Sequence, residues 1–164
     1  MARQTAPGSE RTVAVEVHFN VLGPVTVTRG SMSLDIGGPK QRAVLAMLVA
    51  HMGQPLSADR IAQAVYGPDA SSRQRRTVQT YVSTLRKELG GAIVKRGARW
   101  MLDIERDTVD AYRFEHLYGS ASGLEASAAG ELLRDALSEW RGHPYSGIDA
   151  HGALDAEITR LSEL

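Results

Sequence analysis

The stretch from Arg73 to Leu89, RQRRTVQTYVSTLRKEL, has the helical periodicity that most constrains the fold of this chain. At 100° per residue, its apolar side chains share one side of a helix: Val78, Val82, Leu85 and Leu89, with Tyr81 at their flank. Arginine, lysine and small hydroxyl side chains occupy the opposite side. Such a helix packs on a core through its apolar stripe and leaves the other face outside. The segment therefore predicts a packed helix with a polar, cationic outer face.

The net charge of zero conceals a strong charge asymmetry along the 164 residues. Residues 1–106 carry 15 Lys and Arg against 8 Asp and Glu, a balance of +7, whereas residues 107–164 carry 4 against 11, a balance of −7. Eight cations and a single acid, Glu88, lie between Arg73 and Arg99. A basic half next to an acidic half favours nucleic-acid binding by the basic half.

Extended structure is predicted near the N-terminus. Residues 1–12 are polar and show no periodicity, so they predict a disordered arm. Alternating or extended patterns, broken by glycine and proline, then follow over residues 13–19, 25–28 and 32–36. Segments of this kind form strands with one buried face. They predict a small antiparallel sheet at the start of the chain.

Two helices are predicted between this sheet and the basic helix. Pro39 can open the first, since proline is tolerated at the first helical position, and the helix stops near Gly53. Ser57 is a suitable N-cap for the second, with Asp59 in its first turn. The second helix ends at Gly67-Pro68, and a polar loop over residues 69–72 leads into the basic helix.

A basic hairpin is predicted after the basic helix, which ends at Gly90-Gly91. Strand-like segments over residues 93–95 and 100–104 flank the short loop Arg96-Gly97-Ala98-Arg99. Two helices, a basic helix and a basic hairpin, in this order, are typical of a winged helix-turn-helix. We therefore predict an α+β chain with a winged-helix DNA-binding domain over residues 13–105, whose recognition helix spans 73–89 and whose wing spans 93–104.

This arrangement divides the candidate DNA contacts into two groups. The side chains expected at base edges are Arg76, Gln79, Thr80, Ser83, Thr84 and Lys87. Those expected at the DNA backbone or in the minor groove are Lys40, Arg42, Arg73, Arg75, Arg86, Lys95, Arg96 and Arg99. For Lys40 and Arg42 a solvated first helical turn is an equal alternative, while Tyr81 and Trp100 are expected to pack in the core.

The acidic part of the chain, residues 106–164, predicts an all-α domain. Its helices are expected over residues 107–117, 124–140 and 150–164, with Trp140 in their core. The packing side of the second helix is expected to consist of Ala129, Leu132, Leu133, Ala136, Leu137 and Trp140. Paired short helices with apolar faces are how helical repeats of the tetratricopeptide type begin, and such units need about three repeats to bury their faces. The third helix still has an apolar stripe, so we expect a truncated chain, a dimer contact or a reduced domain.

Several classes of function are disfavoured by what the sequence lacks. With no cysteine there is no disulfide or thiolate metal site, which fits the cytoplasm. The run Gly37-Gly38-Pro39-Lys40 lacks the spacing and hydroxyl residue of a phosphate-binding loop, the five histidines are scattered, and Asp59 and Asp110 are better explained as helix caps. The longest apolar run, Ala43 to Ala50, is too short to span a bilayer. We expect no enzyme, cofactor, metal or membrane association.

Five segments of this chain resemble a known family: Phe19-Asn20-Val21-Leu22-Gly23-Pro24, Gly37-Gly38-Pro39-Lys40-Gln41-Arg42-Ala43, Thr77-Val78-Gln79-Thr80-Tyr81-Val82-Ser83-Thr84-Leu85-Arg86-Lys87, Val109-Asp110-Ala111 with Phe114, and Trp140-Arg141-Gly142. In this order they are similar to the antibiotic-regulatory-protein (SARP) family of actinobacterial transcription regulators. The similarity extends over nearly everything from Val15 onward. It departs from the family at the wing, where Gly97-Ala98-Arg99-Trp100 replaces a Pro-Gly-Tyr type sequence, and in the short helical domain.

The resemblance implies an OmpR-type winged helix followed by a tetratricopeptide-like bacterial transcriptional activation domain. It also implies an activator that binds promoter direct repeats, as a homodimer or in tandem, and contacts RNA polymerase in the nucleoid. Two alternatives stay open. The chain can be a DNA-binding repressor or architectural factor, since its helical domain is short. It can also be a helical protein-interaction module whose basic helix meets an acidic partner rather than DNA.

Overall fold

The computed structural model describes residues 16–164, and its first element is a three-stranded antiparallel sheet. Strand β1 spans Val17–Asn20, β2 spans Thr26–Arg29 and β3 spans Met32–Ser33. Residues Phe19 and Val27 lie opposite each other in the register and are fully buried, so one face of the sheet belongs to the core. The predicted disordered arm 1–12 and residues 13–15 of the predicted first strand lie outside the described residues.

The winged-helix half, residues 16–105, continues with three helices. These are α1 (Pro39–Ala50), α2 (Ala58–Tyr66) and α3 (Ser72–Leu89), each within a few residues of its predicted range. Ala43 to Val49 of α1 are all buried, which makes α1 the central helix, surrounded on every side. The predicted cap of α2 is confirmed, because the Ser57 hydroxyl accepts a hydrogen bond from the Arg60 amide.

A second sheet carries the wing. Strands β5 (Ile93–Arg96) and β6 (Arg99–Leu102) form the predicted hairpin. A third strand, β4 (Leu56–Ser57), pairs with β6 so that the order in the sheet is β4-β6-β5. This two-residue strand was not predicted, since it is too short to show any alternation of its own. It attaches Arg99 and Trp100 of β6, the end of that strand next to the hairpin turn, to the residue that caps α2.

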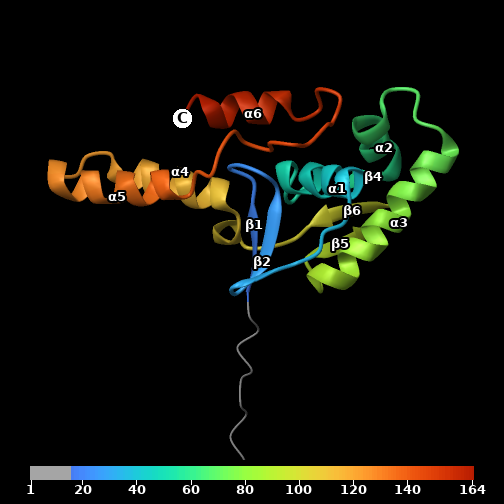
Figure 1. Ribbon diagram of the computed structural model, residues 1–164, viewed down its shortest axis with the longest axis horizontal. Coiled ribbons are helices and arrows are strands. Elements are labelled where there is room, and N and C mark those ends of the chain that lie inside the picture. The colour runs from blue at the N-terminus through green and yellow to red at the C-terminus, as the bar shows by residue number, and fades with distance from the viewer. Residues whose placement is uncertain (1–15) are drawn as a thin grey trace, which may run out of the picture.

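The helical half, residues 106–164, contains a short 3₁₀ helix η1 (Arg106–Thr108) and the helices α4 (Asp110–Ala121), α5 (Ala126–Ser138) and α6 (Asp155–Ser162). Helices α4 and α5 form an antiparallel pair that projects to one side, away from α1–α3 and the wing (Figure 1). The third helix was expected from residue 150, but it begins at Asp155. The backbone at His151 and Gly152 is left-handed, with φ of 46° and 78°, and forms a turn instead.

In the helical half, the predicted packing of apolar side chains is confirmed for Trp140 but wrong for Leu137. The Trp140 ring lies half-buried and meets the Phe114 ring edge-on, with a centroid distance of 5.3 Å. Leu137, in contrast, was grouped with the packing side chains of α5 but is 64% exposed. Helical periodicity alone could not predict that Trp140 is partly buried and Leu137 exposed, because α5 packs on α4 alone over most of its length.

A buried carboxylate joins the two halves. The Asp110 side chain, at the start of α4, is 1% exposed. Its oxygens accept hydrogen bonds from the backbone amides of Val21 (2.8 and 2.9 Å) and Leu22 (3.0 Å), which lie in the loop between β1 and β2, and of Ala111 (2.8 Å). Burial raises the pKa of the Asp110 carboxyl, and the amides and the Arg141 guanidinium partly offset this rise. Asp110 was expected as a helix cap, but Val109 occupies the N-cap position of α4 and makes no side-chain cap. Asp110 is instead the first helical residue, and besides the Ala111 amide its carboxylate holds a loop distant in sequence.

The carbonyl groups of the same loop are bonded to the segment that follows α5. The amides of Arg141 and Tyr145 donate to the carbonyls of Leu22 (2.7 Å) and Val21 (2.8 Å). Gly23 lies against Arg141 so closely that an added Cβ would stand 3.0 Å from the Arg141 Cβ, at a φ of 149° that favours glycine. The loop thus finds its hydrogen-bond partners in the helical half, and both halves contribute to one hydrophobic core.

We expect Asp110→Asn to lower the free energy of unfolding by about 3 kcal/mol, because the new amide group cannot accept from all the buried N–H donors that the carboxylate serves. Urea denaturation followed by circular dichroism measures the loss. The control is Asp135→Asn on the exposed surface of α5, for which we expect a change within about 0.5 kcal/mol. Equal stability of the two variants would contradict the structural role of Asp110.

Candidate nucleic-acid interface

Helix α3 is fixed at its N-terminus by a reciprocal cap. The Ser71 hydroxyl accepts from the Gln74 amide at 3.2 Å, and the Gln74 side chain accepts from the Ser71 amide at 2.7 Å. This arrangement satisfies two backbone donors that the first turn of a helix would otherwise leave without partners. Residues 69–72 were predicted as a loop, but α3 begins at Ser72, and the spacing of Ser71 and Gln74 is the local signal for this cap.

The apolar stripe of α3 packs as predicted. Val78, Val82 and Leu85 are fully buried and Leu89 is 3% exposed, while Tyr81 at the flank is half-buried. These side chains face α1 and α2, the two helices in contact with α3. Because the stripe determines the rotation of α3 about its axis, it also determines which side chains point outward.

The outer face of α3 is the set of exposed side chains predicted to reach base edges: Arg76, Gln79, Thr80, Ser83, Thr84 and Lys87. Its three hydroxyl groups donate to carbonyl oxygens one turn earlier, at 3.0 to 3.3 Å. Since the hydroxyl hydrogens are engaged in this way, the oxygens present lone pairs outward and act as acceptors. The face therefore combines outward acceptors with cationic donors.

The wing is a tight, basic hairpin. Its two-residue turn is Gly97-Ala98, and Gly97 has the positive φ of 61° that this turn needs. Trp100 is 8% exposed and anchors the hairpin in the core, as predicted. Arg96 and Arg99 are exposed and lie directly opposite each other, with Arg96 also 3.7 Å from Asp103. Two like charges in a cross-strand pair repel each other, and a bound anion relieves the repulsion.

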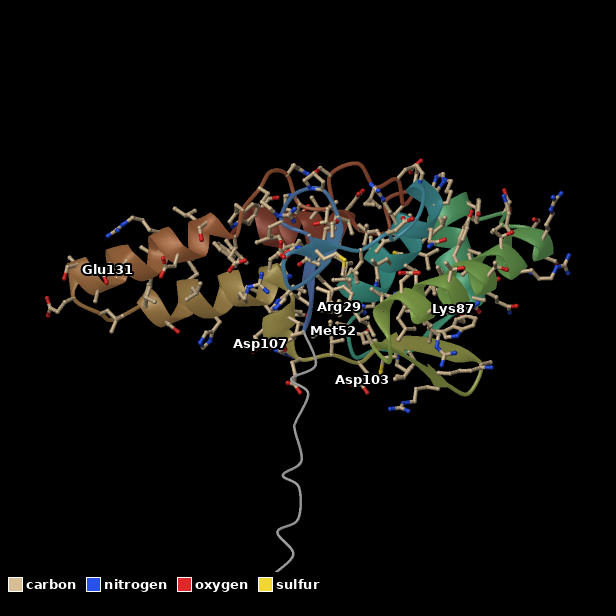
Figure 2. The ribbon with its side chains drawn as sticks, turned by 60° about the horizontal axis from the view of Figure 1, so that its bottom comes forward. Arg29, Met52, Lys87, Asp103, Asp107 and Glu131 are labelled. Carbon is tan, nitrogen blue, oxygen red and sulfur yellow. The ribbon has the colours of Figure 1, made fainter. Side chains whose placement is uncertain are left out.

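The outer face of α3 and the wing form one continuous surface. A hollow of about 320 Å³ between them is lined by Gln79, Ser83, Arg86, Lys95, Ala98 and Trp100. The Arg86 guanidinium donates to the Ile93 carbonyl at 3.2 Å and so holds β5 against α3. Figure 2 shows Lys87 on the part of α3 next to the hairpin, with Asp103 at the base of the hairpin.

The remaining cations that were predicted to contact the DNA backbone differ in their exposure and in the hydrogen bonds or ion pairs that they form within the protein. Arg73 is exposed at the start of α3, and the exposed Arg42 donates to the Gly37 carbonyl at 3.0 Å. Lys40 is half-buried: its ammonium donates to the Val65 carbonyl at 2.7 Å and lies 5.3 Å from the centre of the Tyr66 ring. Arg75 forms an ion pair with Asp59 at 2.6 Å. Arg42, Lys40 and Arg75 therefore all have internal partners, and of the three only Arg42 is exposed.

One contact near this surface was missed by the sequence analysis. The guanidinium of Arg29, at the end of β2, donates to the carbonyl of Glu88 in the last turn of α3 at 2.9 Å. The two residues are 59 positions apart, and no local pattern connects them. Only the fold places the end of the first sheet next to the end of this helix.

Other kinds of site find little support among residues 16–164. No group of three or more His, Asp or Glu side chains in this part of the chain could hold a metal ion. None of its helices is both long and apolar enough to cross a membrane. A hollow of about 720 Å³ lies along η1 and α4, apart from the α3 surface.

Two domain families match this chain in sequence. Residues 36–98 match the family described as transcriptional regulatory protein, C terminal. Residues 109–164 match the bacterial transcriptional activator domain. The first match covers α1 to the wing, and the second covers α4 to α6. The predicted order, a winged helix followed by an activator-type helical segment, is thereby confirmed.

Two regulatory proteins align with most of this chain. The transcriptional regulatory protein MoaR1 of Mycobacterium tuberculosis is 39% identical over 146 residues, which cover 80% of this chain and 46% of MoaR1. The regulatory protein AfsR of Streptomyces coelicolor is 31% identical over 168 residues, which cover 98% of this chain and 17% of AfsR. The chain therefore spans less than half the length of these relatives.

The fold is similar to that of a solved regulator. The structure of Mycobacterium tuberculosis EmbR, in complex with a low-affinity phosphopeptide, superposes with a TM-score of 0.81 and 31% identity. The match covers 90% of this chain and 42% of EmbR. All three relatives are regulators, which agrees with the expectation that the chain is not an enzyme. With both domain families present in this order, the chain belongs to the SARP family of transcriptional regulators, an OmpR-type winged helix joined to a bacterial transcriptional activator domain.

Proposed function

We propose that this chain binds promoter DNA in a sequence-specific manner, with α3 in the major groove and the wing on the adjacent backbone. The proposal rests mainly on the surface formed by α3 and the wing. The outer face of α3 is polar, cationic and exposed, and it runs without a break into the exposed cations of the wing. A helix and a hairpin in this arrangement are the two elements by which winged-helix proteins bind a duplex.

The outer face of α3 has the chemistry for base recognition. Arg76 and Lys87 can donate to the O6 and N7 atoms of guanine, and Gln79 matches the N6 and N7 atoms of adenine. The hydroxyl oxygens of Thr80 and Ser83, which have lone pairs outward, can accept from the amino groups of cytosine or adenine. The Thr84 hydroxyl, at the edge of the outer face, donates to the Thr80 carbonyl and can accept from a base in the same way.

Phosphate and minor-groove contacts are proposed for the wing and the ends of the helices. Lys95, Arg96 and Arg99 lie on the hairpin, and a bound phosphate would relieve the repulsion between the two arginines. Arg42, Arg73 and Arg86 are exposed nearby in the winged-helix half. Lys40 and Arg75 rank last among the proposed contacts, because they are half-buried and each would also have to share or leave its internal partner.

We also propose that the bound protein activates transcription by contacting RNA polymerase through the helical half. The match of residues 109–164 to an activator domain supports this proposal. A single winged helix covers a short site, so binding to direct repeats, as a homodimer or in tandem, would lengthen the recognised sequence. The protein would then act in the cytoplasm, on nucleoid DNA. Transcription from a repeat-bearing promoter with purified polymerase separates an activator from a repressor or architectural factor.

We expect Arg76→Ala combined with Lys87→Ala to weaken duplex binding and to reduce its salt dependence. Each lost phosphate contact lowers the slope of log K against log salt by about one unit, and each lost base contact costs about 1–3 kcal/mol. Fluorescence anisotropy with a labelled duplex of mixed sequence, across a salt series, measures both quantities.

The control for this experiment is Arg134→Ala, which removes an exposed cation from α5, far from the wing. It should leave both affinity and slope unchanged. If the wild-type chain fails to bind duplex DNA at low salt, or if Arg134→Ala has as large an effect as the α3 variant, DNA is not bound at α3. The protein-interaction module then becomes the leading explanation of the basic helix.

Base contacts and backbone contacts should respond differently to substitution. Once a binding sequence has been selected from a random duplex pool, Gln79→Ala should cost about 1–3 kcal/mol on that sequence and relax the preference at one position. Arg99→Ala should instead weaken binding to all sequences about equally and lower the salt slope by about one. The opposite pattern would exchange the roles of α3 and the wing.

A further inference from the structure

The last turn of α3 is held from outside by an arginine. The Arg29 guanidinium, at the end of β2, donates to the Glu88 carbonyl at 2.9 Å. In Figure 2, Arg29 lies between the N-terminal sheet and the end of α3. Helices α1 and α2 pack on α3 along its apolar stripe, whereas Arg29 contacts its C-terminal end. This contact adds a constraint at the end of the helix next to Lys87.

The contact has a clear physical basis. The last four carbonyls of a helix have no partner within the helix, and they form the negative end of its dipole. A guanidinium supplies both a donor and a positive charge to that end. Because it is planar and rigid, it loses little freedom on binding. Arg29 is half-buried as a residue, and its hydrogen bond to the Glu88 carbonyl lies at the exposed surface of the protein.

The strand that carries Arg29 is fixed at its other end. The loop before β2 is bonded to Asp110 and to the backbone of Arg141 and Tyr145. The Arg141 side chain also donates to the Pro24 carbonyl at 3.3 Å and lies 3.4 Å from the Thr26 hydroxyl, at the start of β2. Arg29 therefore extends from a strand whose position is set by the helical half.

From these contacts we infer that Arg29 is a positioning residue for DNA recognition: it holds the C-terminal turn of α3 at the depth and angle at which Lys87 and Thr84 meet the groove. The inference rests on the proposed function. Arg29 acts through the Glu88 carbonyl and itself touches no phosphate. Loss of Arg29 should therefore lower affinity without removing a counterion-releasing contact.

The test compares wild type, Arg29→Ala and Arg29→Lys with the control Arg134→Ala, each with all 164 residues of this chain. Anisotropy with the labelled mixed-sequence duplex gives affinity and salt slope, and hydrogen exchange of the free protein reports on the amides of the last turn of α3. We expect Arg29→Ala to lose about three- to tenfold in affinity at unchanged slope and to exchange faster in that turn. Arg29→Lys, which keeps a charged donor, should recover most of the affinity.

Two results would overturn the inference. A salt slope that falls by about one unit in Arg29→Ala would make Arg29 a direct phosphate contact. Unchanged affinity and unchanged exchange would mean that the contact positions nothing. If wild type does not bind the duplex, the proposed function fails as a whole, and this outcome is distinct because it appears before any variant is compared. Thermal melting of each variant identifies a loss of affinity that comes from unfolding.

Discussion

The buried carboxylate of Asp110 is the interaction on which the arrangement of both halves depends. It accepts hydrogen bonds from the amides of Val21 and Leu22 and from the Ala111 amide in the first turn of α4. A group this deeply buried is costly unless its hydrogen bonds are made, so the loop between β1 and β2 and the start of α4 are constrained to meet. The carbonyls of the loop, bonded to the chain after α5, complete the same junction.

From that junction the constraints extend to the DNA-facing surface. The loop fixes the start of β2, the first sheet covers part of the shared core, and β2 ends at Arg29 against α3. On the other side, α1 is buried all round and gives α3 a surface to pack on. Helix α3 is thus oriented by its apolar stripe, and Arg86 holds the wing beside it. The result is a rigid basic surface in one half and an acidic, projecting helix pair in the other.

The sequence predicted those parts of the fold that local periodicity determines. The stripe of α3 and the cap at Ser57 required only neighbours along the chain, and so did the hairpin around Gly97. The parts it could not predict depend on contacts distant in sequence. Strand β4 exists only because β6 is there to pair with it. The Arg29–Glu88 contact has no local signal either.

The same distinction applies to the candidate site. Periodicity alone identified which side of α3 is exposed, because a packed helix must bury its stripe. It could not reveal that Lys40 and Arg75 have partners inside the protein, since Val65 and Asp59 meet them only after α1, α2 and α3 have packed together. Periodicity also could not distinguish the exposed Leu137 from the packed side chains of α5, because few other elements pack against the pair of helices α4 and α5.

Directed cleavage can show whether α3 and the wing are the surface of this chain that meets DNA. The chain has no cysteine, so a single cysteine introduced as Ser72→Cys at the exposed start of α3, Ala98→Cys on the wing or Ser138→Cys on α5 can carry a tethered iron chelate that cuts nearby DNA. With a duplex bearing a selected site, the first two positions should cut at a few defined nucleotides, and the third should give no localised cutting. Localised cutting from α5, with none from α3 or the wing, would contradict the account.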